Sequence, residues 1–113
     1  MKIEWVQKDF NDCIDKVTYT KKIQRSDFLP YGKHPIISQE AKFINGYWNK
    51  NDDLYKTDVP VVIFGDHTQV LKYIDFDFVL GADGVKILKA RPFLYPKYLY
   101  YYLQSIHIKN LGY

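Results

Sequence analysis

The apolar residues of this chain recur with two periods, which predict helices near its two ends. Near the N-terminus, four residues have the i, i+3, i+4 and i+7 spacing of one helical face: Phe10, Cys13, Ile14 and Val17. We expect a short helix there, followed by a strand over the β-branched run 17–20. A second, amphipathic helix is expected from Pro96, which suits a first helical turn, to Gly112. Its apolar face contains Tyr98, Leu99, Tyr102, Leu103 and Ile106.

The segments between these helices predict strands and turns. Residues 21–35 contain two prolines and a glycine without a sustained period, so we expect a loop, and Pro35–Ser38 is typical of a short strand. Residues 39–56 are polar but include four aromatic residues, which fits either a long excursion or a hairpin with an exposed tip.

Two clearer units follow. Residues 59–64, the turn 65–68 and residues 69–74 predict a β-hairpin. Residues 76–80, the glycine-bearing turn 81–84 and residues 85–89 predict a second strand–turn–strand unit. The sequence therefore predicts an α+β domain with a twisted, mostly antiparallel sheet, flanked by the two helices.

Composition narrows the class of protein. The 113 residues are 47% hydrophobic and 26% charged, which is typical of one globular domain over 1–113. The aromatic content of 18%, with 11 Tyr, favours a contact surface, and the net charge of +3 permits a polyanionic partner. A lone Cys13, the lack of a secretory signal at Met1–Val6 and the lack of an apolar span of roughly 18 residues favour a cytoplasmic protein.

Three segments in the middle of the chain resemble the recognition domains of type I restriction-modification specificity subunits. They are PVVIFGDHT at 60–68, YIDF at 73–76 and VLGADGVKIL at 79–88. Upstream, 4–6 and HPIISQ at 34–39 before FINGY at 43–47 resemble the family's opening strand and its P-x-I-S element, and 98–111 is similar to its closing helix. The resemblance covers nearly the whole chain in the right order.

This resemblance implies a non-catalytic domain that recognises one half of a split target in double-stranded DNA. In the family, the complete subunit carries two such domains joined by helical spacers, bridges methyltransferase subunits and recruits the restriction subunits. This chain has one domain and stops before the spacer helix, which puts its assembly with those partners in doubt. We expect the isolated domain to be monomeric and to need no cofactor or metal.

The most enzyme-like cluster is Asp66-His67-Thr68, because an imidazole beside a carboxylate and a hydroxyl can transfer protons. Neighbours in a tight turn rarely point at one another, and Asp and Thr commonly bond to turn N–H groups. The alternatives are therefore a structural turn, DNA contact by His67, Thr68 or Gln69, and catalysis. A hydrolase built on Asp66 and His67 remains a rival function.

The segment 39–51 is our first choice for base recognition, because it combines aromatic rings, amides and cations. Its candidates are Gln39, Lys42, Asn45, Tyr47, Trp48, Lys50 and Asn51. Amides can pair with adenine and lysines can reach guanine. The alternative is that Tyr47 and Trp48 anchor a long loop to the core.

Three lysines on the predicted strands, Lys72, Lys86 and Lys89, alternate with apolar residues, so we expect their ammonium groups to face water. There they either neutralise phosphates or form an ordinary solvated face. The helix tyrosines at 98 and 100–102 suggest one packed side and one side facing a partner, so a protein-interaction domain is the main rival function. The sequence has no zinc-ligand spacing, no phosphate-binding glycine motif and no amino-methyltransferase motif.

Overall fold

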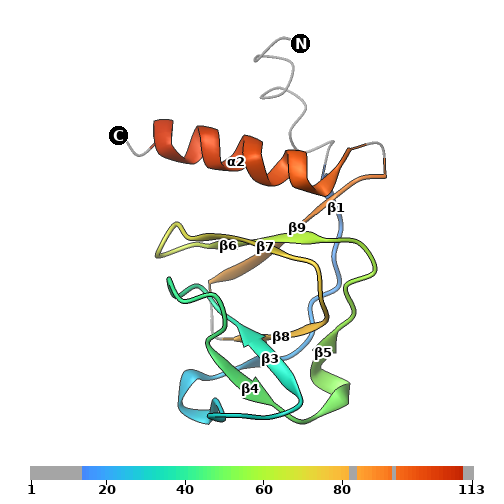
Figure 1. The fold of residues 1–113 in the computed structure, drawn as a ribbon, viewed down its shortest axis with the longest axis vertical. Coiled ribbons are helices and arrows are strands. Elements are labelled where there is room, and N and C mark those ends of the chain that lie inside the picture. The colour runs from blue at the N-terminus through green and yellow to red at the C-terminus, as the bar shows by residue number, and fades with distance from the viewer. Residues whose placement is uncertain (1–13, 82–83, 93, 111–113) are drawn as a thin grey trace.

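The computed structural model describes residues 14–81, 84–92 and 94–110, the last five as backbone only. These residues form two sheets and one helix, stacked in the order helix, sheet, sheet (Figure 1). The α+β class predicted from the sequence is confirmed, with two sheets in place of the single expected sheet.

The sheet beneath the helix has four antiparallel strands in the order β1-β9-β6-β7. Their bounds are β1 Ile14–Asp15, β9 Val85–Ala90, β6 Val61–Gly65 and β7 Leu71–Ile74. The predicted hairpin is confirmed, because β6 pairs with β7 from Val61 opposite Ile74 to Phe64 opposite Leu71. This hairpin presents the turn 66–69 at one edge of the molecule.

The second sheet has five strands arranged around β8, Phe78–Gly81. The strands β2 Lys22–Ile23 and β3 His34–Ile37 pair with β8 in parallel, and β5 Leu54–Tyr55 pairs with it antiparallel. Strand β4, Gly46–Trp48, folds back antiparallel on β3. The segment after β3 is therefore a hairpin, one of the two predicted alternatives. Single turns of 3-10 helix, η2 Arg25–Asp27 and η3 Asn51–Asp53, complete this layer.

Hydrophobic side chains fill both spaces between the layers. The larger cluster lies between the two sheets and includes Ile37, Val61, Ile63, Ile74, Phe78, Leu80, Val85 and Ile87. A smaller cluster joins Val62 and Ala90 to Leu99 and Leu103 of helix α2, Pro96–Asn110. Because Val61 and Ile63 face one cluster and Val62 the other, β6 is apolar on both faces. This explains its unbroken apolar run, since each fully buried Val or Ile contributes about 1.5–3 kcal/mol.

Helix α2 begins at Pro96, as predicted. Its buried face is centred on Leu99 and Leu103, which are 2% and 8% exposed. Tyr98, which the sequence placed on the same face, is 42% exposed. The helix therefore packs with a narrower apolar stripe than the sequence suggested.

The prediction of a helix at the N-terminal end is wrong in the part that the structure describes. Ile14 lies in β1 opposite Ala90, and 16–21 contain no helix or strand. Phe10 and Cys13 lie outside the described residues. Ile14 packs beside the cluster under α2 whereas Val17 packs against the cluster between the sheets, so the two cannot share one helical face. The strand predicted over 17–20 is also absent, and β2 forms within the expected loop.

The glycine-bearing segment 81–84 connects two sheets, so the second predicted unit is a corner and not a hairpin. Strand β8 belongs to the lower sheet and β9 to the sheet beneath the helix. A Cβ on Gly81, the last residue of β8, would come within 2.7 Å of Ile36 Cγ2 and Phe28 Cζ, so these side chains pack this closely because the residue is glycine. Ala82 and Asp83 lie outside the described residues.

Candidate nucleic-acid interface

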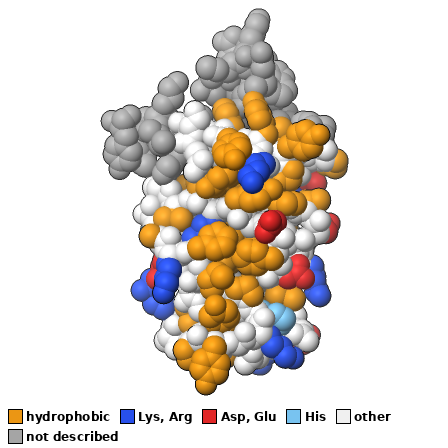
Figure 2. Space-filling model, viewed as in Figure 1, with side chains coloured by type: hydrophobic (Ala, Val, Ile, Leu, Met, Phe, Trp, Pro, Cys, Tyr) orange, Lys and Arg blue, Asp and Glu red, His pale blue; other side chains and the backbone are white. Residues whose placement is uncertain are grey.

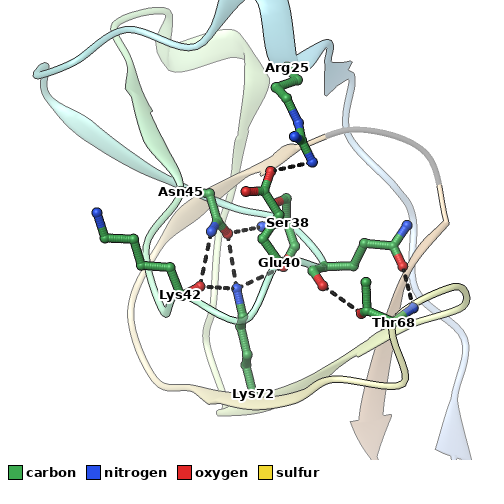
Figure 3. Close-up of polar contacts among 8 residues, drawn as sticks. Arg25, Ser38, Glu40, Lys42, Asn45, Thr68 and Lys72 are labelled. Atoms are coloured by element: carbon green, nitrogen blue, oxygen red, sulfur yellow. Dashed lines mark hydrogen bonds and ion pairs between the residues drawn. The ribbon is translucent and has the colours of Figure 1, made fainter.

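Two segments that the sequence offered for DNA recognition lie side by side at one edge of the molecule. They are the turn 66–69 of the β6–β7 hairpin and the loop 38–45 between β3 and β4, which we call the 38–45 loop. His67 N donates a hydrogen bond to Gln39 Oε1 at 2.9 Å. Thr68 N donates to the same oxygen at 3.2 Å, and Thr68 Oγ1 donates to the Gln39 carbonyl (Figure 3). Gln39 therefore joins the loop to the turn.

Glycines make this close packing possible. A Cβ on Gly65 would lie 2.5 Å from Gln39 Cβ and from Thr68 Oγ1. Gly84 has a φ of 80°, in the left-handed region that favours glycine, and a Cβ there would lie 2.6 Å from Gln39 Nε2. Asp66 N also donates to the Gly84 carbonyl at 2.8 Å. The two glycine-bearing motifs, far apart in the sequence, thus meet around one glutamine.

The turn itself is held in a defined shape. Gln69 has a φ of 63°, which is unusual for a residue with a side chain, and its N–H donates to the Gly65 carbonyl at 2.9 Å. His67 and Thr68 are exposed at the tip. A strained residue in an exposed, well-bonded turn is often found at binding sites, because the strain persists only where the surrounding contacts enforce it.

Lys72 does not face water, which corrects the expectation from its strand. It is 4% exposed, and its Nζ donates to four oxygens of the 38–45 loop (Figure 3). These are Ser38 O at 2.8 Å, Lys42 O at 2.6 Å, Phe43 O at 3.2 Å and Asn45 Oδ1 at 2.9 Å. The sequence predicted an exposed lysine because it alternates with apolar residues. Both faces of this sheet are covered, however, and Lys72 points to the same buried face as Ile74.

Burial changes the acid–base behaviour of this lysine. It lowers the pKa of Lys72 from 10.5 to about 8, because the charged form loses hydration, and the negative charge of Glu40 opposes this effect. Glu40 is itself paired with Arg25 at 2.8 Å on the outer side of the loop.

Asn45 completes the internal bonding of the loop. Its Oδ1 accepts a bond from Ser38 N at 2.8 Å as well as from Lys72, and its Nδ2 donates to Lys42 O at 3.0 Å. The amides of Gln39 and Asn45 thus bond within the protein. Lys42 contributes only its backbone to this network, and its exposed side chain points away from it (Figure 3).

The remaining candidates of the 39–51 segment lie at the other end of the β3–β4 hairpin. Trp48 pairs with His34 at the start of β3, whereas the 38–45 loop follows its end. Trp48 Nε1 donates to the buried carboxylate of Asp53 at 2.8 Å. Trp48 also packs against a third hydrophobic cluster, which consists of Ile23, Ile36 and Val79. Tyr47 exchanges backbone bonds with Leu29 at 2.9 and 3.1 Å. These contacts favour the anchoring alternative for both residues.

The strand lysines differ in their surroundings. Lys86 lies beside the turn, where its Nζ is 3.7 Å from Asp66 Oδ2 and its side chain is 51% exposed. Lys89 is further along β9 and pairs with Asp58 at 3.4 Å. Lys50 and Asn51 are exposed, and Asn51 Oδ1 lies 2.7 Å from His34 Nε2. Lys86 is therefore the candidate cation beside the turn, whereas the Lys42 side chain lies on the side of the 38–45 loop away from Thr68 (Figure 3).

Apolar groups also reach the surface. An open groove of about 650 Å³ runs beside the 38–45 loop, between residues 28–30 and residues 42–47. Figure 2 shows apolar side chains along the viewed face from the helix to the opposite end. Exposed aromatic residues include Tyr31, Phe43, Tyr95, Tyr98 and Tyr101.

The described residues also bear on other kinds of site. The part of the chain that the structure describes holds no group of three or more potential metal ligands among His, Cys, Asp and Glu. Within the same residues, no helix is long and apolar enough to cross a membrane. The Asp66 carboxylate of the turn pairs with Lys86 of strand β9, which gives this carboxylate a structural role.

Comparison with known proteins agrees with the resemblance seen in the sequence. Over 77 residues the chain is 32% identical to the type I restriction enzyme EcoR124I/EcoR124II specificity subunit of Escherichia coli. The match covers 64% of this chain and 19% of that protein, so the chain spans about a fifth of the relative. No family model and no solved structure matches the chain.

Proposed function

We propose that this chain is a sequence-specific, double-stranded DNA-recognition domain of a type I restriction-modification specificity subunit. It performs no chemistry itself and directs a separate adenine methyltransferase and a restriction subunit to the site. The observation that carries the proposal is the junction of the 38–45 loop with the turn 66–69 through Gln39, which gives one composite edge built from segments that resemble the family's most characteristic motifs.

The exposure and the hydrogen bonds of the candidate residues suggest a different role for each group of them. Lys86 carries an exposed cation beside the turn, and Lys42 carries one on the other side of the 38–45 loop; both contact phosphates and set the register. His67 presents its exposed side chain to base edges, and Gln69 contributes its amide oxygen, because its Nε2 donates to the Asp66 carbonyl. Thr68 shapes the turn, because its Oγ1 donates to the Gln39 carbonyl. Gln39, Asn45 and Lys72 shape the edge from within, because their polar groups bond inside the protein.

A second set of candidates extends the contact along the molecule. Lys50 and Asn51 are exposed at the far end of the β3–β4 hairpin and reach the backbone of the same duplex beyond the groove that the turn enters. Lys89 is held by Asp58 and contributes less.

Fluorescence anisotropy with the 113-residue chain tests this proposal. A duplex selected from a random pool is titrated at a series of salt concentrations, and the affinity should fall steeply with salt. Lys42→Gln and Lys86→Gln should each reduce the slope of log K against log salt by about one. Lys97→Gln is the matched control, because Lys97 lies on α2, over the Tyr73 ring at 5.0 Å. A flat salt response would overturn the proposal.

The alternative is a protein-interaction domain without independent DNA recognition. It is favoured by the exposed tyrosines of the α2 region, since Tyr95 is 83% exposed and Tyr101 is 57% exposed. A pull-down with the partner methyltransferase, with and without DNA, separates the two functions. Capture that is independent of DNA and lost in Tyr101→Ser favours the alternative.

A further inference from the structure

The ammonium group of Lys72 is the common partner of a loop that has no helix or strand of its own. Residues 38–45 connect β3 to β4 by bends alone. Lys72 enters from β7, a strand of the other sheet, and its Nζ lies 2.6 to 3.2 Å from three loop carbonyls and the Asn45 side chain. An ammonium has three N–H groups, so four oxygens at this range saturate it.

One of the three carbonyls belongs to Ser38 at the start of the loop and two belong to Lys42 and Phe43 in its second half, and all three point at one position. Carbonyl dipoles that converge in this way repel one another unless a cation or donor lies between them. The Lys72 ammonium supplies both the positive charge and the N–H donors. Because Lys72 is only 4% exposed, water competes weakly for the same carbonyls. The chain therefore closes the loop around the charge, much as a backbone closes around a bound cation.

The same position lies next to the edge assigned to DNA. Ser38 and Asn45 are bonded to each other and to Lys72, and Gln39 follows Ser38 and holds the turn 66–69. Lys42 projects its side chain outward on the side of the loop away from Thr68 (Figure 3). A change at Nζ is thus transmitted over one or two residues to the exposed groups. The ammonium itself is enclosed and out of reach of a phosphate.

We propose that Lys72 is a positioning residue that fixes the shape of the 38–45 loop and thereby sets the selectivity of DNA binding, without contacting DNA. This inference rests on the proposed function. The charged groups near Lys72 are consistent with a role inside the protein. The Glu40 carboxylate pairs with Arg25, and the Lys72 ammonium bonds to the loop carbonyls.

The test compares Lys72→Met with the exposed Lys42→Gln in the 113-residue chain. Met keeps the length of the apolar stem and removes the donor. The readouts are the ratio of affinities for a selected and a random duplex, and the salt slope of each. Lys72→Met should reduce the ratio by about tenfold with an unchanged slope, whereas Lys42→Gln should reduce the slope by about one with a nearly unchanged ratio.

A third readout does not depend on DNA. Hydrogen exchange of the free protein should show that the Ser38 amide, which donates to Asn45 Oδ1, loses protection in Lys72→Met, while amides of the β6–β9 pairing keep theirs. If the wild type binds no DNA, the proposed function fails, and exchange alone decides whether Lys72 shapes the loop.

Two outcomes would overturn the inference. One is a folded Lys72→Met protein with the wild-type selectivity ratio and Ser38 protection. The other is a salt slope reduced as in Lys42→Gln, which would make Lys72 a phosphate contact. If Lys72→Met does not fold, Asn45→Ala replaces it, because this variant removes one of the four oxygens from the loop side. It should then give the same loss of selectivity with an unchanged salt slope, and Ser38 exchange is not used for this variant, because it removes the acceptor of the Ser38 amide itself.

Discussion

The buried ammonium of Lys72 makes the stability of this protein depend on pH in an unusual direction. Burial lowers the pKa of Lys72 to about 8 in the folded protein, and the unfolded chain restores the ordinary value of 10.5. Between these two values the unfolded state binds more protons than the folded state. The free energy of unfolding therefore gains a contribution that increases with pH through this window.

The size of the effect follows from the two pKa values. Near neutral pH Lys72 is charged in both states, and the full cost of burying the charge applies, roughly 3 kcal/mol at 1.36 kcal/mol per pKa unit. At about pH 9.5 it is neutral in the folded protein and still mostly charged in the unfolded chain. Lys72 should therefore add about 2 kcal/mol to the free energy of unfolding between about pH 7 and about pH 9.5.

Urea denaturation at a series of pH values measures this contribution as a difference between proteins. Lys72→Met lacks the titrating group, so the wild type should gain about 2 kcal/mol relative to it across the window. Lys42→Met is the matched control, because it removes a lysine whose side chain is exposed, and it should follow the wild type. Parallel pH profiles for the wild type and Lys72→Met would refute the idea that folding takes the Lys72 charge out of water.

Two further substitutions test the contacts that support the interface. Gly84→Ala places a side chain at a φ of 80° and within 2.6 Å of Gln39 Nε2, so denaturant unfolding should show a loss of about 1–2 kcal/mol; wild-type stability would contradict this geometry. Trp48→Phe removes the indole donor from the buried Asp53 carboxylate and should cost about 1–3 kcal/mol by the same measurement. Adding Asp53→Asn should then restore part of that loss, and equal losses in both proteins would count against the bond.

Local patterns in the sequence were sufficient for the elements that depend on local chemistry. Strand β6 is a continuous β-branched and apolar run, Gly65 and Asp66 mark the turn before β7, and Pro96 starts the helix where its missing N–H costs nothing. The strand at His34–Ile37 is likewise visible from its own residues.

The two-residue strands could not be found in this way. Strand β1 exists because Ile14 pairs with Ala90, and β2 because Lys22 and Ile23 pair in parallel with the end of β8. Each pairing joins segments far apart in the chain, and a run of two residues carries no period of its own. The helical spacing around Ile14 was outweighed because its neighbours belong to two different clusters.

The candidate interface also combines features that local residues predict with features that depend on long-range packing. The residues 39–51 and the glycine-bearing motifs indicated the region, and the signal for Gln39 was limited to its place beside the P-x-I-S element. Nothing in the local pattern revealed that Gln39 caps the turn or that Lys72 is enclosed, since both follow from how the second sheet lies against the first. A lysine on an alternating strand is exposed only if one face of its sheet is open.

The sequence by itself determined the class of fold, the β6–β7 hairpin, the C-terminal helix and the resemblance to specificity subunits, because these depend on residues that are near one another in the chain. Tertiary structure alone decided the division into two sheets, the corner at Gly81 and Gly84, and the junction of loop and turn. These depend on long-range packing, in which a polar side chain such as Lys72 takes its surroundings from whichever segment covers it.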